Sequence, residues 1–265
     1  MCLILFAYGV HPHYPLLVAA NRDEFHNRPT APLAFWDDCP ELLAGRDLQA
    51  GGTWMGLHRG GRFAALTNYR DPHHIHESAP SRGHLVRDYL QGHCSADAAL
   101  TELLPYAGAY NGFNLLLGDS SGLYWYSNRA DHFQKLVPGL YGLSNHLLNT
   151  PWPKVERGRR ALHEVLAQET LTPEALLEAL LSVLTDRTPA PDAALPATGV
   201  SLPWERWLSP IFIDAPGYGT RSSTVLLADH QGRAHMVEVT WASGNRREFA
   251  LEWPESMGQR PAPST

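Results

Sequence analysis

The sequence predicts an α+β fold in which antiparallel sheets are covered by helices. Short apolar runs separated by Gly-rich or Pro-rich turns, which are typical of β-hairpins, occur at both ends and in the middle of the chain. Two pairs of segments with helical periodicity lie between these runs. Strands and helices are therefore grouped along the chain, whereas a parallel sheet would require them to alternate.

The chain opens with a predicted β-hairpin. An apolar run over residues 2–8 is separated by a Gly- and Pro-containing turn from a second run over 16–20, which ends in Asn21-Arg22-Asp23-Glu24. Because antiparallel strands pair end to end, we expect Cys2 and Asp23 to lie near the same end of this hairpin.

The middle of the chain is predicted to contain a second hairpin and a first pair of helices. Residues 27–40 include three prolines and are interpreted as a loop. The hairpin covers 51–57 and 63–67 and ends at Asn68, and apolar side chains follow at helical spacing over 85–90. Ser95 suits the N-cap of the next helix. Further strands are predicted at 113–117, 123–126 and 140–143, the last ending at Ser144-Asn145.

The second pair of helices and a β-meander complete the prediction. One helix contains the apolar side chains of 155–166, and the other begins with Thr172 as N-cap and Pro173 at its first position. Residues 188–210 include five prolines and are interpreted as a long loop. Strands are expected at 220–228, 234–241 and 247–253, with a frayed tail from about residue 254.

The composition is that of a globular protein with a sizeable core. The 265 residues are 44% hydrophobic and 18% charged, and the net charge of −6 gives no electrostatic case for binding nucleic acid. Three cysteines do not form a disulfide framework, which favours a reducing compartment. No apolar run approaches the ~20 residues of a membrane-spanning helix. We expect one domain over residues 1–265, located in the cytoplasm, without an integral membrane segment.

Cys2 directly follows Met1, and this position suggests chemistry. If Met1 is removed, one residue carries both a thiol and a free α-amine. An α-amine with a pKa of about 7.7–8.0 is partly unprotonated at neutral pH, so it could take the proton of its own thiol. The alternative is that Cys2 is only a buried core residue, as most strand cysteines are.

Several separated motifs resemble one known family. They are Met1-Cys2, Asn21-Arg22-Asp23-Glu24, Gly51-Gly52-Thr53-Trp54, Thr67-Asn68, Gly142-Leu143-Ser144-Asn145 and Tyr218-Gly219-Thr220-Arg221-Ser222-Ser223-Thr224. Their order and spacing resemble the NRDE family, also called the transport and Golgi organization family. The resemblance implies a four-layer αββα sandwich of two antiparallel sheets covered by helices, as in N-terminal nucleophile hydrolases.

A more distant resemblance, to choloylglycine hydrolases and penicillin V acylases, implies roles for individual residues. Cys2 would be the nucleophile, Asp23 would hold the α-amine, and Asn68 and Asn145 would donate to an oxyanion. Arg221 would lower the pKa of the thiol or pair with Asp23. One departure concerns the position three residues before the Asp, where those enzymes have an Arg and this chain has Ala20.

Further residues are predicted to bind substrate. Arg22 lies next to Asp23, although neighbours on a strand point to opposite faces. Trp54 could line an apolar cleft, or be a core anchor. His146 follows Asn145 and could face the site, or stabilise a turn. The histidine clusters lack the ligand spacing of a zinc site, so no metal is expected.

Two functions remain open from the sequence. The first is a cysteine N-terminal nucleophile hydrolase or acyltransferase that acts on a small linear amide or thioester and requires no cofactor. The second, implied by the family resemblance, is a carrier in haem or acyl-lipid trafficking, in which haem is a transported ligand of the same cleft. A thiolate or an imidazole can ligate haem iron. The sequence predicts a small-molecule partner and specifies no oligomeric state.

Overall fold

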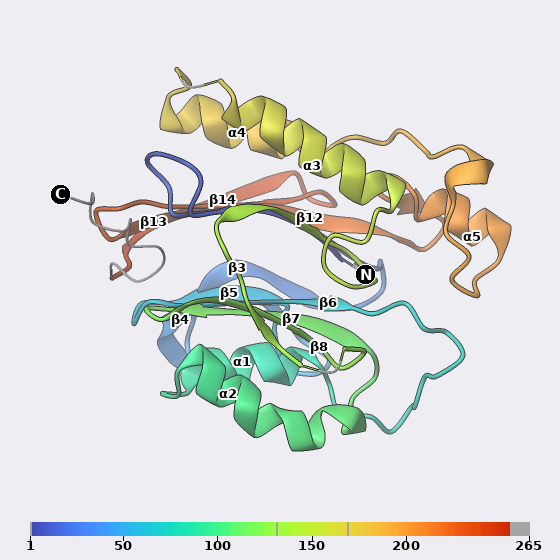
Figure 1. The fold of residues 1–265 in the computed structure, drawn as a ribbon, viewed down its shortest axis with the longest axis horizontal. Coiled ribbons are helices and arrows are strands. Elements are labelled where there is room, and N and C mark those ends of the chain that lie inside the picture. The colour runs from blue at the N-terminus through green and yellow to red at the C-terminus, as the bar shows by residue number, and fades with distance from the viewer. Residues whose placement is uncertain (1, 131, 169, 255–265) are drawn as a thin grey trace.

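The computed structural model describes residues 2–130, 132–168 and 170–254, which form two stacked antiparallel sheets with helices on both outer faces (Figure 1). This four-layer αββα arrangement confirms the predicted α+β class. Apart from Pro254, the tail that was expected to fray lies outside the described residues.

The first sheet has the N-terminal hairpin near its centre. Its strand order is β10-β1-β2-β12-β13-β14, and the short β11 also pairs with β12. The bounds are β1 (Cys2–Tyr8), β2 (Leu16–Phe25), β10 (Gly139–Leu143), β11 (Asp214–Ala215), β12 (Tyr218–Ala228), β13 (Arg233–Thr240) and β14 (Asn245–Glu252). The Asn-Arg-Asp-Glu motif therefore lies within β2 rather than after it.

The second sheet follows the chain in order, β3-β4-β5-β6-β7-β8-β9. The bounds are β3 (Thr30–Trp36), β4 (Cys39–Asp47), β5 (Met55–His58), β6 (Arg62–Asn68), β7 (Phe113–Asp119), β8 (Gly122–Ser127) and β9 (Gln134–Lys135). The loop predicted at 27–40 is therefore wrong. Pro32 is tolerated because β3 is the edge strand, and its pairing with β4 is irregular between Ala31 and Ala34.

Helices cover the outer face of each sheet. α1 (Gly83–Gln91) and α2 (Ala96–Leu103) pack on the second sheet, and α3 (Pro153–Leu166) and α4 (Pro173–Val183) pack on the first. Thr172 caps α4 as predicted, since its side chain accepts a hydrogen bond from the Ala175 N–H at 3.2 Å. Ser95 is at the N-cap position of α2, but the Ala96 N–H donates to Asp119 at 2.6 Å.

The Pro-rich segment 188–210 is not entirely a loop. It contains α5 (Leu202–Trp207), with Ser201 at the N-cap position and a proline in the first turn, where the missing N–H costs no helical hydrogen bond. Among the described residues, no helix is both long and apolar enough to cross a membrane.

Strand alternation decides which side chains meet between the layers. In β1, Ile4 and Phe6 belong to the core between the two sheets, whereas Leu3 and Leu5 belong to the core under α3 and α4. Cys2 belongs to the inner set. The period of two therefore points Cys2 toward the space between the sheets.

A candidate active site around Cys2

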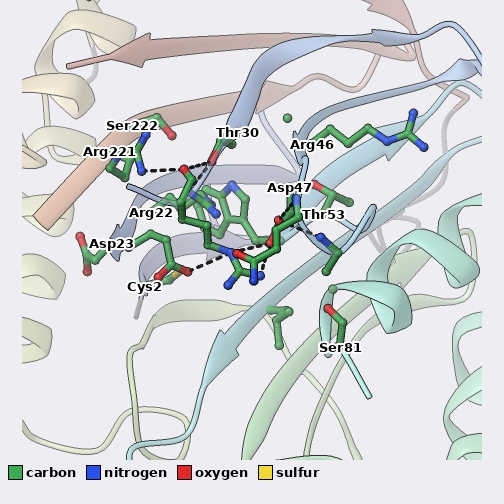
Figure 2. A pocket seen from close by; sticks show the side chains of 18 of the residues that line it. Cys2, Arg22, Asp23, Thr30, Arg46, Asp47, Thr53, Ser81, Arg221 and Ser222 are labelled. Carbon is green, nitrogen blue, oxygen red and sulfur yellow. Dashed lines mark hydrogen bonds and ion pairs between the residues drawn. The ribbon is translucent and has the colours of Figure 1, made fainter. Parts of the chain in front are cut away.

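A cleft of about 620 Å³ lies between the two sheets at the end where β1 begins. Its walls come from both sheets and from the segment that leads into α1 (Figure 2). The predicted site residues in its lining are Cys2, Arg22, Asp23, Trp54, Asn68 and Arg221. Asn145 and His146 are not among the lining residues. The fold thus gathers residues from both ends of the sequence around one cavity.

Cys2 reaches this cleft as the first residue of β1. Its relative exposure is 8%, so the thiol is largely withdrawn from solvent. Its partner across the ladder is Arg22. Because directly paired residues project from the same face of a sheet, the Arg22 guanidinium extends on the thiol's side.

The environment of Cys2 favours the protonated thiol. Burial raises the pKa of the Cys2 thiol, and the negative charge of Asp23 raises it further. The charge of the chain's amino terminus, the charge of Arg22 and the backbone N–H of Asp23 lower it, but the net pKa is above the ordinary value. A nucleophilic Cys2 therefore needs a base to take its proton.

Arg22 connects the two sheets across the cleft. It is buried, and its Nη1 donates to the Thr30 hydroxyl of β3 at 3.4 Å. Neighbouring residues on a strand point to opposite faces, so Arg22 and Asp23 project to different sides of β2. Arg22 shares its face with Cys2 and therefore reaches the site.

Arg221 is held differently. The pairing of β12 with β2 shifts between Thr220 and Ser222, which makes Arg221 the bulged residue. Its Nη1 donates to the carbonyl oxygens of Phe25 at 2.7 Å and Arg28 at 3.1 Å. These contacts hold the segment after β2 in place. Arg22, rather than Arg221, is the arginine whose charge lowers the pKa of the Cys2 thiol.

Asp23 lies beside Cys2 (Figure 2) and is almost completely buried. Its Oδ1 accepts a hydrogen bond from the Thr220 hydroxyl at 2.7 Å. Burial raises the pKa of the Asp23 carboxyl, and the positive charge of Lys154 is the largest opposing influence. The carboxyl group is thus positioned by β12, and the charge of Lys154 in the helix layer partly offsets the effect of its burial.

Asn68 and Asn145 form one interaction near Cys2. The Asn145 side-chain amide donates to the Asn68 carbonyl at 3.0 Å, and the Ser144 hydroxyl donates to the Cys2 carbonyl at 3.2 Å. Asn145 is fully buried and the Arg70 N–H donates to its carbonyl at 2.7 Å. Asn68 therefore faces the cleft, while Asn145 ties the end of β6 to the end of β10.

Trp54 and His146 have different surroundings. Trp54 lines the cleft and belongs to the core between the sheets. The His146 ring contacts Tyr69 and Trp152, and its Nδ1 is 2.9 Å from the Thr150 hydroxyl oxygen. His146 is therefore part of the packing beside the cleft. Within the described ranges, no group of three or more His, Cys, Asp or Glu side chains could hold a metal ion.

Three charged residues were missed by the sequence reasoning. Lys154 in α3 is almost fully buried near Asp23, and the buried Glu238 of β13 lines the cleft. Arg82 also lines the cleft and donates to the Gly112 carbonyl at 2.9 Å. None shows a local signal, because a charged residue in an amphipathic element ordinarily faces solvent.

Comparison with known proteins points to one family. A family model described as Transport and Golgi organisation 2 matches residues 1–243. The Transport and Golgi organization protein 2 homolog of Bos taurus is 37% identical over 260 residues, which cover 90% of this chain and 92% of the relative.

Two solved structures are similar at a lower level. A Caenorhabditis elegans ortholog of N-acylethanolamine-hydrolyzing acid amidase has a TM-score of 0.43 at 11% identity, covering 85% of this chain and 92% of that one. A mutant conjugated bile acid hydrolase from Clostridium perfringens has a TM-score of 0.40 at 8% identity, covering 99% and 100%.

Proposed function

The chain belongs to the Transport and Golgi organisation 2 family, and we propose that Cys2 is an N-terminal nucleophile that cleaves or transfers an acyl group. The substrate would be a small linear amide or thioester. The observation that carries the proposal is the position of Cys2, whose side chain lines a cleft of about 620 Å³ from the first residue of a central strand.

The proposed reaction begins with removal of Met1. The freed α-amine of Cys2 takes the proton that the raised pKa keeps on the thiol. The sulfur then attacks the substrate carbonyl carbon, and the carbonyl π-electrons move to oxygen, where the Asn68 side chain is the nearby candidate donor. Asp23 holds the α-ammonium by a charge-assisted hydrogen bond.

The acyl-enzyme then forms and is resolved. The tetrahedral intermediate expels its amine or thiol, which takes the proton from the α-ammonium, and a thioester to Cys2 remains. Water or an acceptor attacks this thioester while the α-amine again takes a proton. The thiol of Cys2 is regained when the sulfur leaves and accepts that proton.

Charged side chains of both signs line the cleft, and three of its arginines are candidates to bind an anionic group of the substrate. Arg22, Arg82 and Arg221 line the cleft, and within the described part of the chain none of the three forms an ion pair with a carboxylate. In contrast, Arg28 is paired with Asp47 at 2.6 Å. Guanidinium groups without an ion-pair partner suit a carboxylate or phosphate on the substrate.

The test is mass spectrometry of the purified protein before and after reaction with an electrophilic β-lactone. We expect a chain that lacks Met1 and a single acyl adduct on Cys2. Cys94 is an internal control, because it is exposed and does not line the cleft. Retention of Met1, or labelling of Cys94 without labelling of Cys2, would refute the α-amine mechanism.

A second candidate is the carrier, which the same lining also suits. Arginines could pair with the propionates of haem, and Cys2 is the one described lining residue with a sulfur or imidazole ligand for iron. A carrier needs no free α-amine. Haem titration followed at the Soret band would then show binding that Cys2→Ala weakens strongly, whereas unchanged binding in that variant would exclude Cys2 as the ligand.

A further inference from the structure

Lys154 is a buried cation that the reaction proposed above does not use. It lies in the first turn of α3, its relative exposure is 2%, and its Nζ has no hydrogen-bond partner among the described residues. The positive end of a helix dipole disfavours a lysine there, and burial of an ammonium group is costly. Such a placement needs a compensating negative charge.

The position of α3 brings Lys154 to the Cys2 end of the first sheet. Val155 packs in the core with Leu3 and Leu5, and Gly158 lies so close that a Cβ there would be 2.8 Å from Leu5 Cδ1. The first turn of α3 therefore lies over the beginning of β1. Asp23 lies on the adjacent end of β2, and its charge affects the pKa of Lys154 more than any other described charge does.

The other charges nearby are already matched. Arg70 and Glu205 form a buried ion pair at 2.8 Å, with both side chains about 5% exposed. They border a small cavity that Lys154 also lines. Glu205 is thus engaged by Arg70, and the charge of Asp23 acts on Lys154 more strongly than that of Glu205 does.

The groups that face Asp23 come from several elements. Thr220 donates to it, and the positive charges of Lys154, the chain's amino terminus and Arg22 lower its pKa against the dominant effect of burial. The charge of Asp23 raises the pKa values of its titratable neighbours Cys2 and Tyr218. It also acts to raise the pKa of Arg70. Among the described cations, Lys154 has the largest effect on Asp23.

We infer that Lys154 is a positioning residue of the Cys2 site, a buried counter-ion that keeps Asp23 ionised so that Asp23 can hold the α-amine of Cys2. The inference rests on the proposed function for the role of the α-amine. Burial lowers the pKa of Lys154 to about 8, and the charge of Asp23 opposes that shift. Lys154 is therefore mainly protonated at neutral pH, as a counter-ion must be.

The chain offers a direct test because it contains two lysines, Lys135 and Lys154. Protein labelled with [13C]lysine gives two side-chain signals, and the exposed Lys135 is the internal control. We expect the Lys154 signal to titrate near pH 8 and to shift by about one unit to lower pH in Asp23→Asn, because the counter-charge is lost. An unchanged Lys154 midpoint in that variant would overturn the inferred electrostatic interaction between Lys154 and Asp23.

The functional test compares Lys154→Met with Lys135→Met. We expect the pH profile for β-lactone acylation of Cys2 to move to higher pH in Lys154→Met, because loss of the cation raises the pKa of Asp23. The rate should recover at higher pH and in Lys154→Arg, and Lys135→Met should match the wild type. If Lys154 only filled space, the pH profile would keep its midpoint, and that result would refute the inference.

The two tests separate this inference from the proposed function. Lysine titration requires no reaction at Cys2, so it reports the Lys154–Asp23 interaction even where the β-lactone leaves Cys2 unmodified. A shifted lysine midpoint without any acylation would contradict the proposed function alone. Acylation with an unshifted midpoint would contradict the role of Lys154 alone.

Discussion

At the start of β1, a buried thiol and a buried guanidinium project from paired positions on one face of the sheet. The pairing of Cys2 with Arg22 follows from the hairpin register, and Arg22 then reaches Thr30 on the opposite sheet. The charge of Arg22 lowers the pKa of the thiol against a dominant effect of burial. Arg22 is thus one of the charges on which the reactivity of the thiol depends.

Replacement of Arg22 by Gln removes this charge, so the pKa of the Cys2 thiol should rise further. At a fixed pH below that pKa, the variant then has a smaller thiolate fraction than the wild type. We therefore expect iodoacetamide to alkylate Cys2 several-fold more slowly at pH 7 in the variant. Peptide mass spectrometry over a pH series measures the midpoint. Arg46→Gln is the matched control, because Arg46 lines the cleft but pairs with Asp38 at 2.7 Å. Equal midpoints in the two variants would contradict the role of Arg22.

At the scale of elements, the cleft depends on a close approach between a loop and a helix start. Gly52 precedes Thr53 and Trp54, and the Thr53 N–H donates to the Gly83 carbonyl at 3.2 Å, where α1 begins. A Cβ at Gly52 would be 2.5 Å from the Gly83 carbonyl carbon and 2.7 Å from its oxygen. Both partners are backbone, so neither can rotate away.

We therefore expect Gly52→Ala to destabilise the protein by about 2 kcal/mol or more, through displacement of α1 from the strand ends. Urea unfolding measures the loss. Gly108→Ala is the matched control, because a Cβ there meets nothing within 4 Å. A Gly52→Ala variant as stable as Gly108→Ala would show that the two segments separate without cost.

At the scale of the whole molecule, the two sheets are joined by side chains as well as by the core. Glu238 of β13 accepts a hydrogen bond from the Leu33 N–H of β3 at 2.8 Å, which links the first sheet to the edge of the second. Glu238 is buried, and burial raises the pKa of its carboxyl. The carboxyl group therefore contributes to sheet packing and borders the cleft.

A folded-state pKa above the ordinary Glu value of 4.5 makes the folded protein bind protons more tightly than the unfolded chain. The stability from this group is present below that value and is lost as the pH rises through the folded pKa. Glu238→Gln stays neutral and keeps an oxygen acceptor for Leu33. We expect its free energy of unfolding, relative to wild type, to increase from pH 4 to pH 7, and a constant difference would contradict the shift.

The sequence by itself determined the elements whose signals are local. The run 2–8, the turn and the run 16–20 predicted the central hairpin, and Thr172 with Pro173 predicted α4, because alternation, periodicity and capping act within a few residues. Grouping of these elements predicted the layers. The same hairpin placed Cys2 and Asp23 at one end, which the structure shows beside each other.

Only the tertiary structure decided what surrounds those two residues. β3 was interpreted as a loop because an edge position, which permits Pro32, is a property of the sheet and not of the segment. Lys154 and Glu238 were missed for a related reason. Whether a charged side chain is buried depends on partners far away in sequence, and the free energy that permits it comes from those partners.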